Sequence, residues 1–389
     1  MEKVCVGVVG CGAFAGTQHL PNCTGNPKIE LTWACDPSEE KLRFAEETFH
    51  PRRVSREAGE VFAADDVDMV ILAVPHGLHE EMISRAAAAG KHILCEKPMS
   101  MSNQESYRIV RHVEKAGVKL CVDYNRRFAP SMVDLRKAFQ AHRAHPVETP
   151  WKLHNPSRRR AMVEEEATVL LARIQDESST YRMVHVDPST GGGQVIGETC
   201  HWLDLTCFIL EKTPTRIFAT GSSRLNHVVT MEFADGSLAC ILFGVTGTFD
   251  YPKELLEIQD HGALFINHNC VENEFYGLVE PVRRTYPLQA DDFPDAGREG
   301  GRFGYIAKVR ARGLAYAASG RKAFGNVIPD KGHSELLDAF VTSILQDRPS
   351  PIDERAGARA TYLAVRAVES IREGHPLPVN VEELDFYVH

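Results

Sequence analysis

The chain has 389 residues, which is more than one compact core usually contains, so we expect at least two domains. Hydrophobic residues make up 43% of the chain and charged residues 25%, as in ordinary globular proteins. A formal net charge of −9 argues against nucleic acid and anionic membranes as partners. No apolar run reaches the roughly 18–20 residues that cross a bilayer.

The ten cysteines include no CxxC pair, and several lie in apolar runs, where free cysteine behaves as a small buried hydrophobe. We therefore predict neither a disulfide framework nor a metal site. A strand pattern starts at Val4, and we see no export signal before it. These features favour a soluble protein of the reducing cytoplasm.

Residues 1–125 alternate short apolar runs with amphipathic stretches, which is the rhythm of a parallel α/β sheet. The expected strands are Val4–Val9, Ile29–Cys35, Met69–Ala73, His92–Cys95 and Lys119–Val122. The expected helices are Glu39–Phe49, Leu78–Ala89 and Asn103–Ala116. We predict a Rossmann dinucleotide-binding domain over this range.

After Pro130 the pattern changes to one helix at Ser131–Ala141 and then a segment with clustered charges. Residues 157–177 can form one amphipathic helix, either a solvated insertion or oligomer contact, or a substrate lid that carries arginines. From Thr180 onward the residues favour antiparallel strands, with reversals at Asp235-Gly236 and His261-Gly262. The expected strands are Tyr181–Val186, Arg216–Thr220, His227–Phe233, Leu238–Val245, Glu254–Gln259 and Ala263–Asn267.

Three further helices are expected, from about Gly193 to Leu210, at Ser334–Gln346 and at Glu354–Glu373. The predicted fold is α/β, with the Rossmann domain followed at 126–389 by an α/β domain built on a large, mainly antiparallel open sheet. This second domain would bind substrate, and its terminal helices would pack back on the first. An open sheet face is a natural contact between subunits, so we expect a homodimer or homotetramer.

A glycine-rich motif follows the first predicted strand. Gly10, Gly12 and Ala15 fit G-x-G-x-x-G/A, in which small residues allow a tight turn and a close approach to a pyrophosphate. A helix that starts at Ala13 and Phe14 would point free N–H groups at that phosphate. Asp36 ends the second strand, where a carboxylate binds the adenosine ribose and repels a 2′-phosphate, so the motif favours NAD over NADP.

Three further segments resemble the glucose–fructose oxidoreductase / inositol dehydrogenase superfamily. Gly90–Pro98 is similar to its AGKHVLCEKP signature, and Val74–His79 is similar to its TPNxxH segment. Gly191-Gly192-Gly193, followed by His201 and Asp204, resembles GGGxxxDxGxHxxD. The segments Asn125–Phe128 and Asp330–His333 look closest to a subgroup often fused to domains like zinc-dependent alcohol dehydrogenases.

The resemblance implies that Glu96 and Lys97 lie beside the nicotinamide, and that Lys97 and His201 are the catalytic pair at the substrate hydroxyl. Pro75, His76 and His79 would lie on the cofactor side. Removal of a hydride from a carbinol carbon needs a base for the hydroxyl proton and stabilisation of the developing alkoxide. A lysine and a histidine could divide these tasks, and the sequence leaves open which of them accepts the proton.

The chain departs from the family pattern at two places. Gly197 stands where the family has an aspartate, four residues before the histidine, and His76 stands where the family commonly has asparagine. Glu198, three residues before His201, could share a helix face with it and act as an additional catalytic group. Glu198 could instead point away and only satisfy nearby donors.

The remaining site candidates each have a structural alternative. Tyr124 follows the last strand of the first domain, where ligands gather, and could act on substrate or only pack. We expect Asn125 on the cofactor side, and the expected substrate contacts are Arg126, Arg127, His185 and Asp204. Surface ion pairing, packing or helix capping would explain the same residues.

These features together predict an NAD-dependent oxidoreductase that acts on a secondary hydroxyl of a small carbohydrate or cyclitol. Two other functions stay open. One is a redox-neutral NAD-dependent glycosidase or lyase, which oxidises a sugar carbon transiently, eliminates the aglycone and restores the alcohol. The other is a catalytically silent sugar or dinucleotide sensor.

Overall fold

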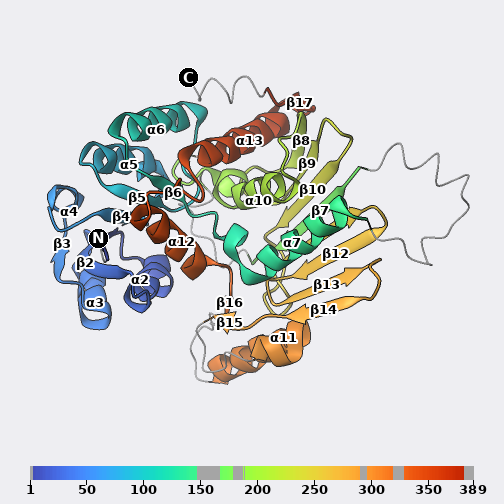
Figure 1. Cartoon of the computed structure of the whole chain (residues 1–389), viewed down its shortest axis with the longest axis horizontal. Helices are drawn as coiled ribbons and strands as arrows, with labels where there is room; N and C mark the ends of the chain where they lie inside the picture. The colour runs from blue at the N-terminus through green and yellow to red at the C-terminus, as the bar shows by residue number, and fades with distance from the viewer. Residues whose placement is uncertain are drawn as a thin grey trace, which may run out of the picture.

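The computed structural model describes residues 3–146, 167–177, 187, 189–289, 296–318 and 328–380. Its first half is a six-stranded parallel sheet of strand order β3-β2-β1-β4-β5-β6 (Figure 1). These strands are β1 (Val4–Val9), β2 (Ile29–Cys35), β3 (Arg53–Ser55), β4 (Met69–Leu72), β5 (His92–Cys95) and β6 (Leu120–Val122). This order, which reverses direction at β1, is that of a doubly wound Rossmann sheet and confirms the predicted fold class.

The first half has six α-helices among the described residues. They are α1 (Ala13–Thr17), α2 (His19–Gly25), α3 (Glu39–Phe49), α4 (Ala58–Ala63), α5 (His79–Ala88) and α6 (Asn103–Ala116). α6 begins after Ser102, whose Oγ accepts a hydrogen bond from Glu105 N, and ends before Gly117, which has left-handed backbone angles. These two capping residues explain why both ends of α6 could be predicted from the sequence. β3 and α4 were not expected because three and six residues are too few to show a period.

The second sheet has nine strands in the described part of the chain, in the order β14-β13-β12-β11-β7-β10-β9-β8-β17. Neighbouring strands are antiparallel except for β7 and β10. The strands are β7 (Val169–Gln175), β8 (Arg216–Gly221), β9 (His227–Glu232), β10 (Leu238–Gly244), β11 (Glu254–Asp260), β12 (Ala263–His268), β13 (Glu272–Tyr276), β14 (Val282–Thr285) and β17 (Leu377–Pro378). A separate short pair joins β15 (Leu288–Gln289) to β16 (Ile328–Pro329).

The helix predicted over 157–177 is wrong where the structure describes this segment. Residues Val169–Gln175 form the central strand β7, in which Leu170, Ala172 and Ile174 alternate inward and are fully or almost fully buried. This period of two is a strand signal, and pairing with β10 and β11 supplies the hydrogen bonds. Residues 157–166 and the expected strand Tyr181–Val186 lie outside the described residues.

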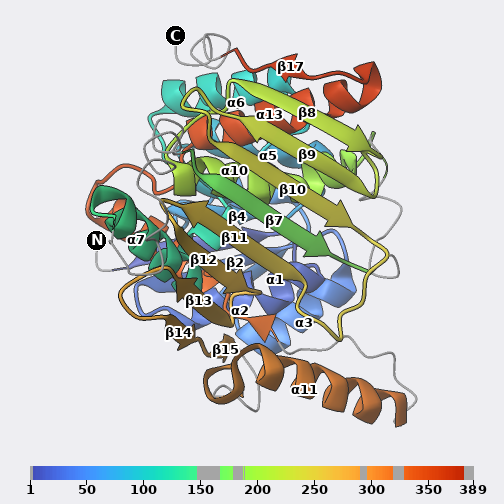
Figure 2. The same cartoon turned by 90° about the vertical axis from the view of Figure 1, so that its right-hand side faces the viewer.

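Helices cover one face of the large sheet, namely α7 (Pro130–Ala144), α10 (Cys200–Leu210) and α13 (Glu354–Glu373) (Figure 1). The opposite face is turned to the viewer in Figure 2, and none of the described helices crosses it. α11 (Ala296–Ala318) lies beside β14 at the sheet edge. None of the helices in the described ranges combines the length and apolar character needed to span a bilayer.

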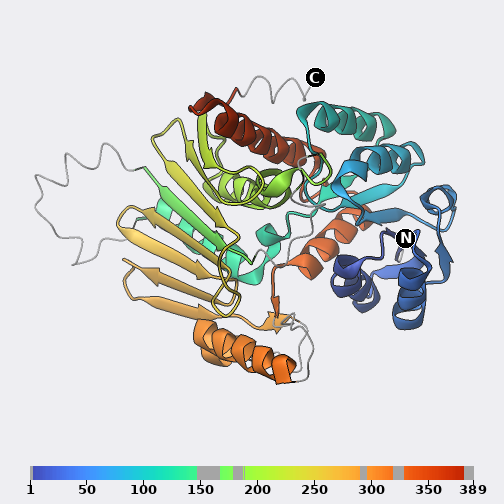
Figure 3. The same cartoon turned by 180° about the vertical axis from the view of Figure 1, so that it is seen from behind.

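The C-terminal helices join the two sheets. α13 packs on both α6 and β8, and α12 (His333–Leu345) contacts α2, β1 and β5. Seen from behind, orange-red α12 lies between the blue helices and the large sheet (Figure 3). A Cβ on Gly357 of α13 would lie 2.5 Å from Met99 Sδ, so this helix packs tightly on the segment after β5.

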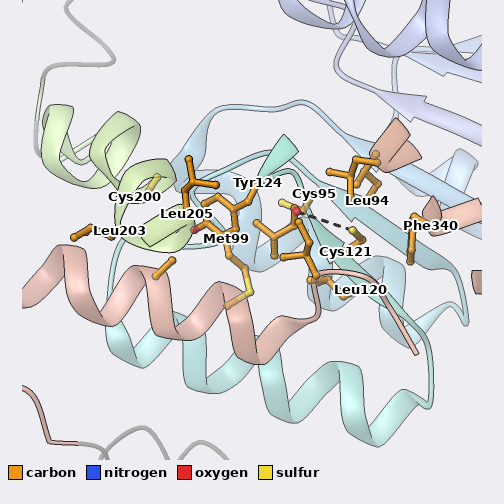
Figure 4. Packing of buried hydrophobic residues seen from close by; sticks show 14 of the residues in the cluster. Leu94, Cys95, Met99, Leu120, Cys121, Tyr124, Cys200, Leu203, Leu205 and Phe340 are labelled. Atoms are coloured by element: carbon orange, nitrogen blue, oxygen red, sulfur yellow. Dashed lines mark hydrogen bonds between the residues drawn. The ribbon is translucent and has the colours of Figure 1, made fainter. Parts of the chain in front are cut away.

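The core is continuous between the halves. Figure 4 shows Leu94, Cys95, Leu120 and Cys121 of the first sheet close to Met99 and Tyr124, with α10 residues Cys200, Leu203 and Leu205 beside them. All of these side chains belong to one buried cluster. This shared core holds the ends of β5 and β6 against the start of α10, and the candidate site lies there.

Candidate active site

The glycine-rich loop fits a dinucleotide. Gly10 has φ +96°, and a Cβ there would lie 2.2 Å from Ala73 O, so only glycine allows this turn from β1 into α1 beside the end of β4. A Cβ on Gly12 would meet nothing within 4 Å, which leaves the approach to the loop open. α1 begins at Ala13 directly after Gly12, and its first-turn N–H groups, including that of Phe14, have no side-chain cap. These backbone donors suit a pyrophosphate.

Asp36 lies at the end of β2, next to this loop. Its Oδ2 accepts from Cys11 N at 2.9 Å and its Oδ1 accepts from Ser38 N at 2.9 Å. Carboxylate oxygens have further lone pairs, which could accept from ribose hydroxyls. Lys41, which sequence reasoning did not consider, places Nζ 3.3 Å from Oδ2 and partly balances the charge.

The segment Glu96-Lys97-Pro98 follows β5 and is held in place by His79. One ring nitrogen of His79 lies 2.7 Å from Pro98 O and the other 3.0 Å from Val74 O, and the side chain is fully buried. Both ring nitrogens of His79 thus lie against backbone carbonyls of two loops, while its expected cofactor contact stays a prediction. Pro75 is exposed and directly precedes the short helix η1 (His76–Leu78).

A buried polar network surrounds Glu96. His19 Nε2 lies 2.7 Å from Glu96 Oε1, and His333 Nδ1 lies 3.2 Å from Asp123 Oδ2. Burial and the Asp123 charge raise the pKa of Glu96 well above its usual range. Burial opposes the Asp123 charge as well, but His333 and His19 lower the pKa of Asp123. Both directions favour a proton on Glu96 over a proton on Asp123.

Asn125 completes this network. Its Nδ2 donates to Lys331 O at 2.9 Å and to His333 Nε2 at 3.0 Å, which leaves the Nδ1 proton of His333 for Asp123. The predicted cofactor contact of Asn125 is thus restricted to Oδ1, which is buried without a hydrogen-bond partner. Sequence reasoning missed the three residues His19, Asp123 and His333. Asp123 could have been found, because it follows β6 as Glu96 follows β5.

Lys97 crosses from the first half to the second. Its Nζ donates to Glu198 Oε1 and to Gly197 O, both at 2.8 Å. Burial opposes the charge, but Glu198 raises the pKa of Lys97 above its ordinary 10.5. Burial likewise opposes ionisation of Glu198, but Lys97, Lys253 and Arg126 lower its pKa to about 2. The two side chains form a stable ion pair.

The expected approach of Glu198 to His201 is therefore corrected. Residues Val195–Thr199 form a π-helical turn, η6, before α10, and its i→i+5 hydrogen bonds change the angle between side chains three residues apart. Glu198 faces Lys97, and His201 Nδ1 is buried without a hydrogen-bond partner. Burial, then Arg126 and Lys97, lower the pKa of His201 well below 6.5, so its imidazole is neutral.

Tyr124 lies beside His201, with ring centroids 5.8 Å apart in an edge-on arrangement. The phenol is 1% exposed and its hydroxyl oxygen has no hydrogen-bond partner. Burial raises the pKa of Tyr124 well above 10, so the hydroxyl keeps its proton. The structure thus brings together Lys97, Glu198, His201 and Tyr124 of the predicted site.

The two departures from the family pattern occupy one place. His76 lies so close to Gly197 that a Cβ on Gly197 would be 3.4 Å from His76 Cε1. His76 Nδ1 also lies 2.9 Å from Gly191 O, in the glycine-rich turn of the second half. The imidazole of His76 thus occupies the space into which a longer side chain at 197 would extend.

The two arginines after Asn125 are paired with carboxylates. Arg127 forms two hydrogen bonds with Asp204, one of them Nε to Oδ2 at 2.7 Å, and both side chains are buried. Each of the two residues therefore has the other as a structural partner, while their predicted substrate contacts stay predictions. Arg126 Nη2 lies 2.6 Å from Glu254 Oε1. His185 lies outside the described residues.

The site combines a glycine-rich loop on a Rossmann sheet, an acidic end to β2 and a charged lysine beside a neutral histidine, and a nucleotide-dependent oxidoreductase needs groups of these kinds. Residues 4–124 match the family model described as "Oxidoreductase family, NAD-binding Rossmann fold", whose name combines glucose–fructose oxidoreductase, inositol dehydrogenase and MocA. Residues 4–124 are thus similar to this family of NAD-binding oxidoreductases. This match confirms the family resemblance of the sequence motifs.

Similar proteins extend the likeness to the second half. Myo-inositol 2-dehydrogenase of Thermotoga maritima is 23% identical over 379 residues, which are 95% of this chain and 96% of that protein. The fold is shared with aldose-aldose oxidoreductase from Caulobacter crescentus in complex with glycerol, at TM-score 0.74 and 16% identity, over 97% of this chain and 100% of that one. It is also shared with the WlbA dehydrogenase from Bordetella pertussis in complex with NADH and UDP-GlcNAcA, at TM-score 0.70 and 18% identity, over 97% and 98%.

Proposed function

We propose that the chain is an NAD-dependent dehydrogenase that interconverts a secondary hydroxyl and a ketone on a sugar, sugar derivative or cyclitol. The observation that carries this proposal is the pair formed by the Lys97 ammonium and the neutral His201 imidazole. Both lie where the carboxyl ends of the first sheet meet α10. Inositol and aldose oxidoreductases among the similar proteins support the substrate class.

Bound NAD+ would supply the acceptor for the hydride that leaves the carbinol carbon. His201, neutral at physiological pH, would accept the proton of the hydroxyl. Lys97 keeps its own proton and would donate a hydrogen bond to the same oxygen as negative charge develops there. The C–H electron pair thus leaves with the hydride, the O–H proton goes to His201, and a ketone remains.

Glu198 would act on Lys97 as a positioning residue. Because it is ionised and bonded to Nζ, it fixes the ammonium and keeps it charged. An ionised Glu198 is a poor proton donor to a leaving aglycone, which weakens the redox-neutral alternative. Tyr124, which keeps its proton beside His201, is the donor that this alternative would need.

The proposal is tested by incubating the protein with NAD+ and a panel of sugars, cyclitols and aryl glycosides. We expect NADH at 340 nm with at least one free polyol, and loss of this activity in His201→Asn. Aglycone release without NADH accumulation would instead support the glycosidase or lyase. Neither product from any member, with NAD+ bound, would support the sensor.

The open face of the large sheet is our proposed contact between subunits. Leu238 and Leu242 of β10 and Val169 of β7 are each at least 40% exposed on neighbouring strands. A homodimer or homotetramer that buries this face would remove these side chains from water. Light scattering after size exclusion should give twice or four times the 43.3 kDa chain mass, and Leu242→Glu should lower it.

A further inference from the structure

The ionised side chains around His201 carry more positive than negative charge. Lys97 is paired with Glu198 and Lys253 with Asp176, so these four side chains balance. Glu254, in contrast, is shared by two cations, with Arg126 Nη2 and Lys331 Nζ each 2.6 Å from its Oε1. Asp123 does not offset this, since it is bonded to His333 in the first half. Burial lowers the pKa of Lys331 although the Glu254 charge acts against it, as expected for an ammonium that shares its counter-ion. With Lys331 protonated, one positive charge is left over at Arg126 and Lys331.

This excess charge lies close to His201. Arg126 is the group whose charge lowers the pKa of His201 most after burial, and Lys97, His333 and Lys331 act in the same direction. Arg126 is 7% exposed and also lies over the ring of Trp202, the residue after His201, at 5.4 Å. A buried charge without a counter-ion is costly, so an anion placed here would be stabilised.

Lys331 is held rigidly and has donors to spare. Gly332 has φ +84°, and a Cβ there would lie 2.3 Å from Ala129 N, so the loop fits on η2 (Asn125–Phe128) only with glycine. The Lys331 carbonyl accepts from Asn125 Nδ2 at 2.9 Å. The ammonium has three donors, and the described residues supply one acceptor, Glu254, while 17% of the side chain is exposed.

We propose that the substrate carries an anionic group, a carboxylate or a phosphate, and that Lys331 and Arg126 bind this group beside the hydroxyl that faces Lys97 and His201. The statement about the hydroxyl rests on the proposed function, but the anion site does not. A neutral sugar would leave the excess charge at Lys331 unmatched. The substrate class is therefore sugar acids or sugar phosphates in preference to neutral sugars.

The test measures binding, so that it does not depend on turnover. The NADH complex of the full chain is titrated calorimetrically with matched pairs: D-gluconate and D-glucitol, D-glucuronate and D-glucose, and D-glucose 6-phosphate and D-glucose. We expect at least one anionic member to bind at least tenfold more tightly than its neutral partner. The first two pairs report a carboxylate and the third a phosphate.

Variants locate the effect. Lys331→Gln should reduce the difference between acid and neutral partner to less than threefold, and Lys331→Arg should retain it. Lys28→Gln, which removes a lysine paired with Asp338 on the surface between α12 and the first sheet, should leave the difference unchanged. The melting temperature shows whether Lys331→Gln folds. If it does not fold, the anion site is judged from the matched pairs on the wild type and on Lys331→Arg.

Equal binding within every pair, tighter binding of the neutral partners, or no binding at all would overturn the anion site. An equal loss for acid and neutral partner in Lys331→Gln would also overturn it, and would assign Lys331 to stabilising Glu254 alone. An acid that binds tightly but yields no NADH with NAD+ would contradict the proposed function and leave the anion site standing.

Discussion

Replacement of Glu198 by glutamine tests how Lys97 is held. In the wild type, Lys97 Nζ lies 2.8 Å from Glu198 Oε1. The variant keeps a side-chain oxygen that can accept from Nζ and removes the negative charge. A hydrogen bond to a charged partner stabilises by about 1.5–3 kcal/mol, and the 28% exposure of Glu198 places this pair in the lower part of that range. A second bond to Gly197 O keeps the lysine in place, so we expect a loss of about 1.4 kcal/mol in the transition state, which is tenfold in kcat.

The pH dependence gives a second readout with a definite sign. In the wild type the Lys97 ammonium has a pKa above 10.5, so activity should fall only as the pH rises beyond that value. In Glu198→Gln the partner that raises this pKa is gone, and the alkaline fall should begin at lower pH. Burial keeps His201 neutral until well below pH 6.5. The fall of activity at acid pH should therefore not shift to higher pH in the variant.

The assay is kcat and kcat/KM between pH 6 and 11, with melting temperatures at each pH. Glu80→Gln is the matched control, because Glu80 pairs with Arg108 on the surface and should not affect the rate. A kcat for Glu198→Gln within twofold of wild type, with an unmoved alkaline fall, would refute a positioning role. A changed melting temperature alone would then assign Glu198 to stability.

Four further outcomes are expected. Lys97→Ala should abolish most turnover but leave the NAD dissociation constant within about tenfold, since transition-state contacts contribute little to ground-state affinity; retained turnover would contradict this. Asp36→Ala should weaken NAD more than NADP in fluorescence titrations, whereas equal losses would reduce Asp36 to a loop contact. Gly197→Asp should destabilise by about 1–3 kcal/mol through overpacking against His76, and His76→Asn should relieve part of this in the double variant; simple additivity would disprove the coupling. The ion pair should make Glu198→Gln less stable than wild type above pH 4.5, and this difference should vanish as the pH falls through about 2.

The sequence predicted the Rossmann half well because its signals are local. β1, β2, α3 and α6 begin and end at the predicted residues, since apolar runs and caps lie within each element. β7 was missed because its short alternation becomes a strand only through partners in β10 and β11, more than 60 residues away. The outward Val169 and the inward Leu170 and Ile174 were interpreted together as one face of a helix.

The site was predictable where one motif supplies the chemistry and not where distant segments meet. Lys97 and His201 were predicted from their motifs, and their catalytic roles stay predictions. The partner of Glu198 was not, because a regular α-helix was assumed where the chain forms a π-helical turn. The mutual bond of Arg127 and Asp204 was missed for a similar reason, because it joins η2 to α10 and cannot be read from either segment.

The central claim is that NAD+ would take a hydride from a carbinol carbon held at Lys97 and His201, and transfer of deuterium tests it most directly. A substrate from the panel, deuterated at the reacting carbon, is mixed with the NAD+ complex, and the nicotinamide is analysed by mass spectrometry after one turnover. Deuterium in the nicotinamide of the wild type, with a loss of at least a hundredfold in transfer rate for His201→Asn, is the expected result. Ketone formation or bond cleavage with no deuterium in the nicotinamide would contradict the account.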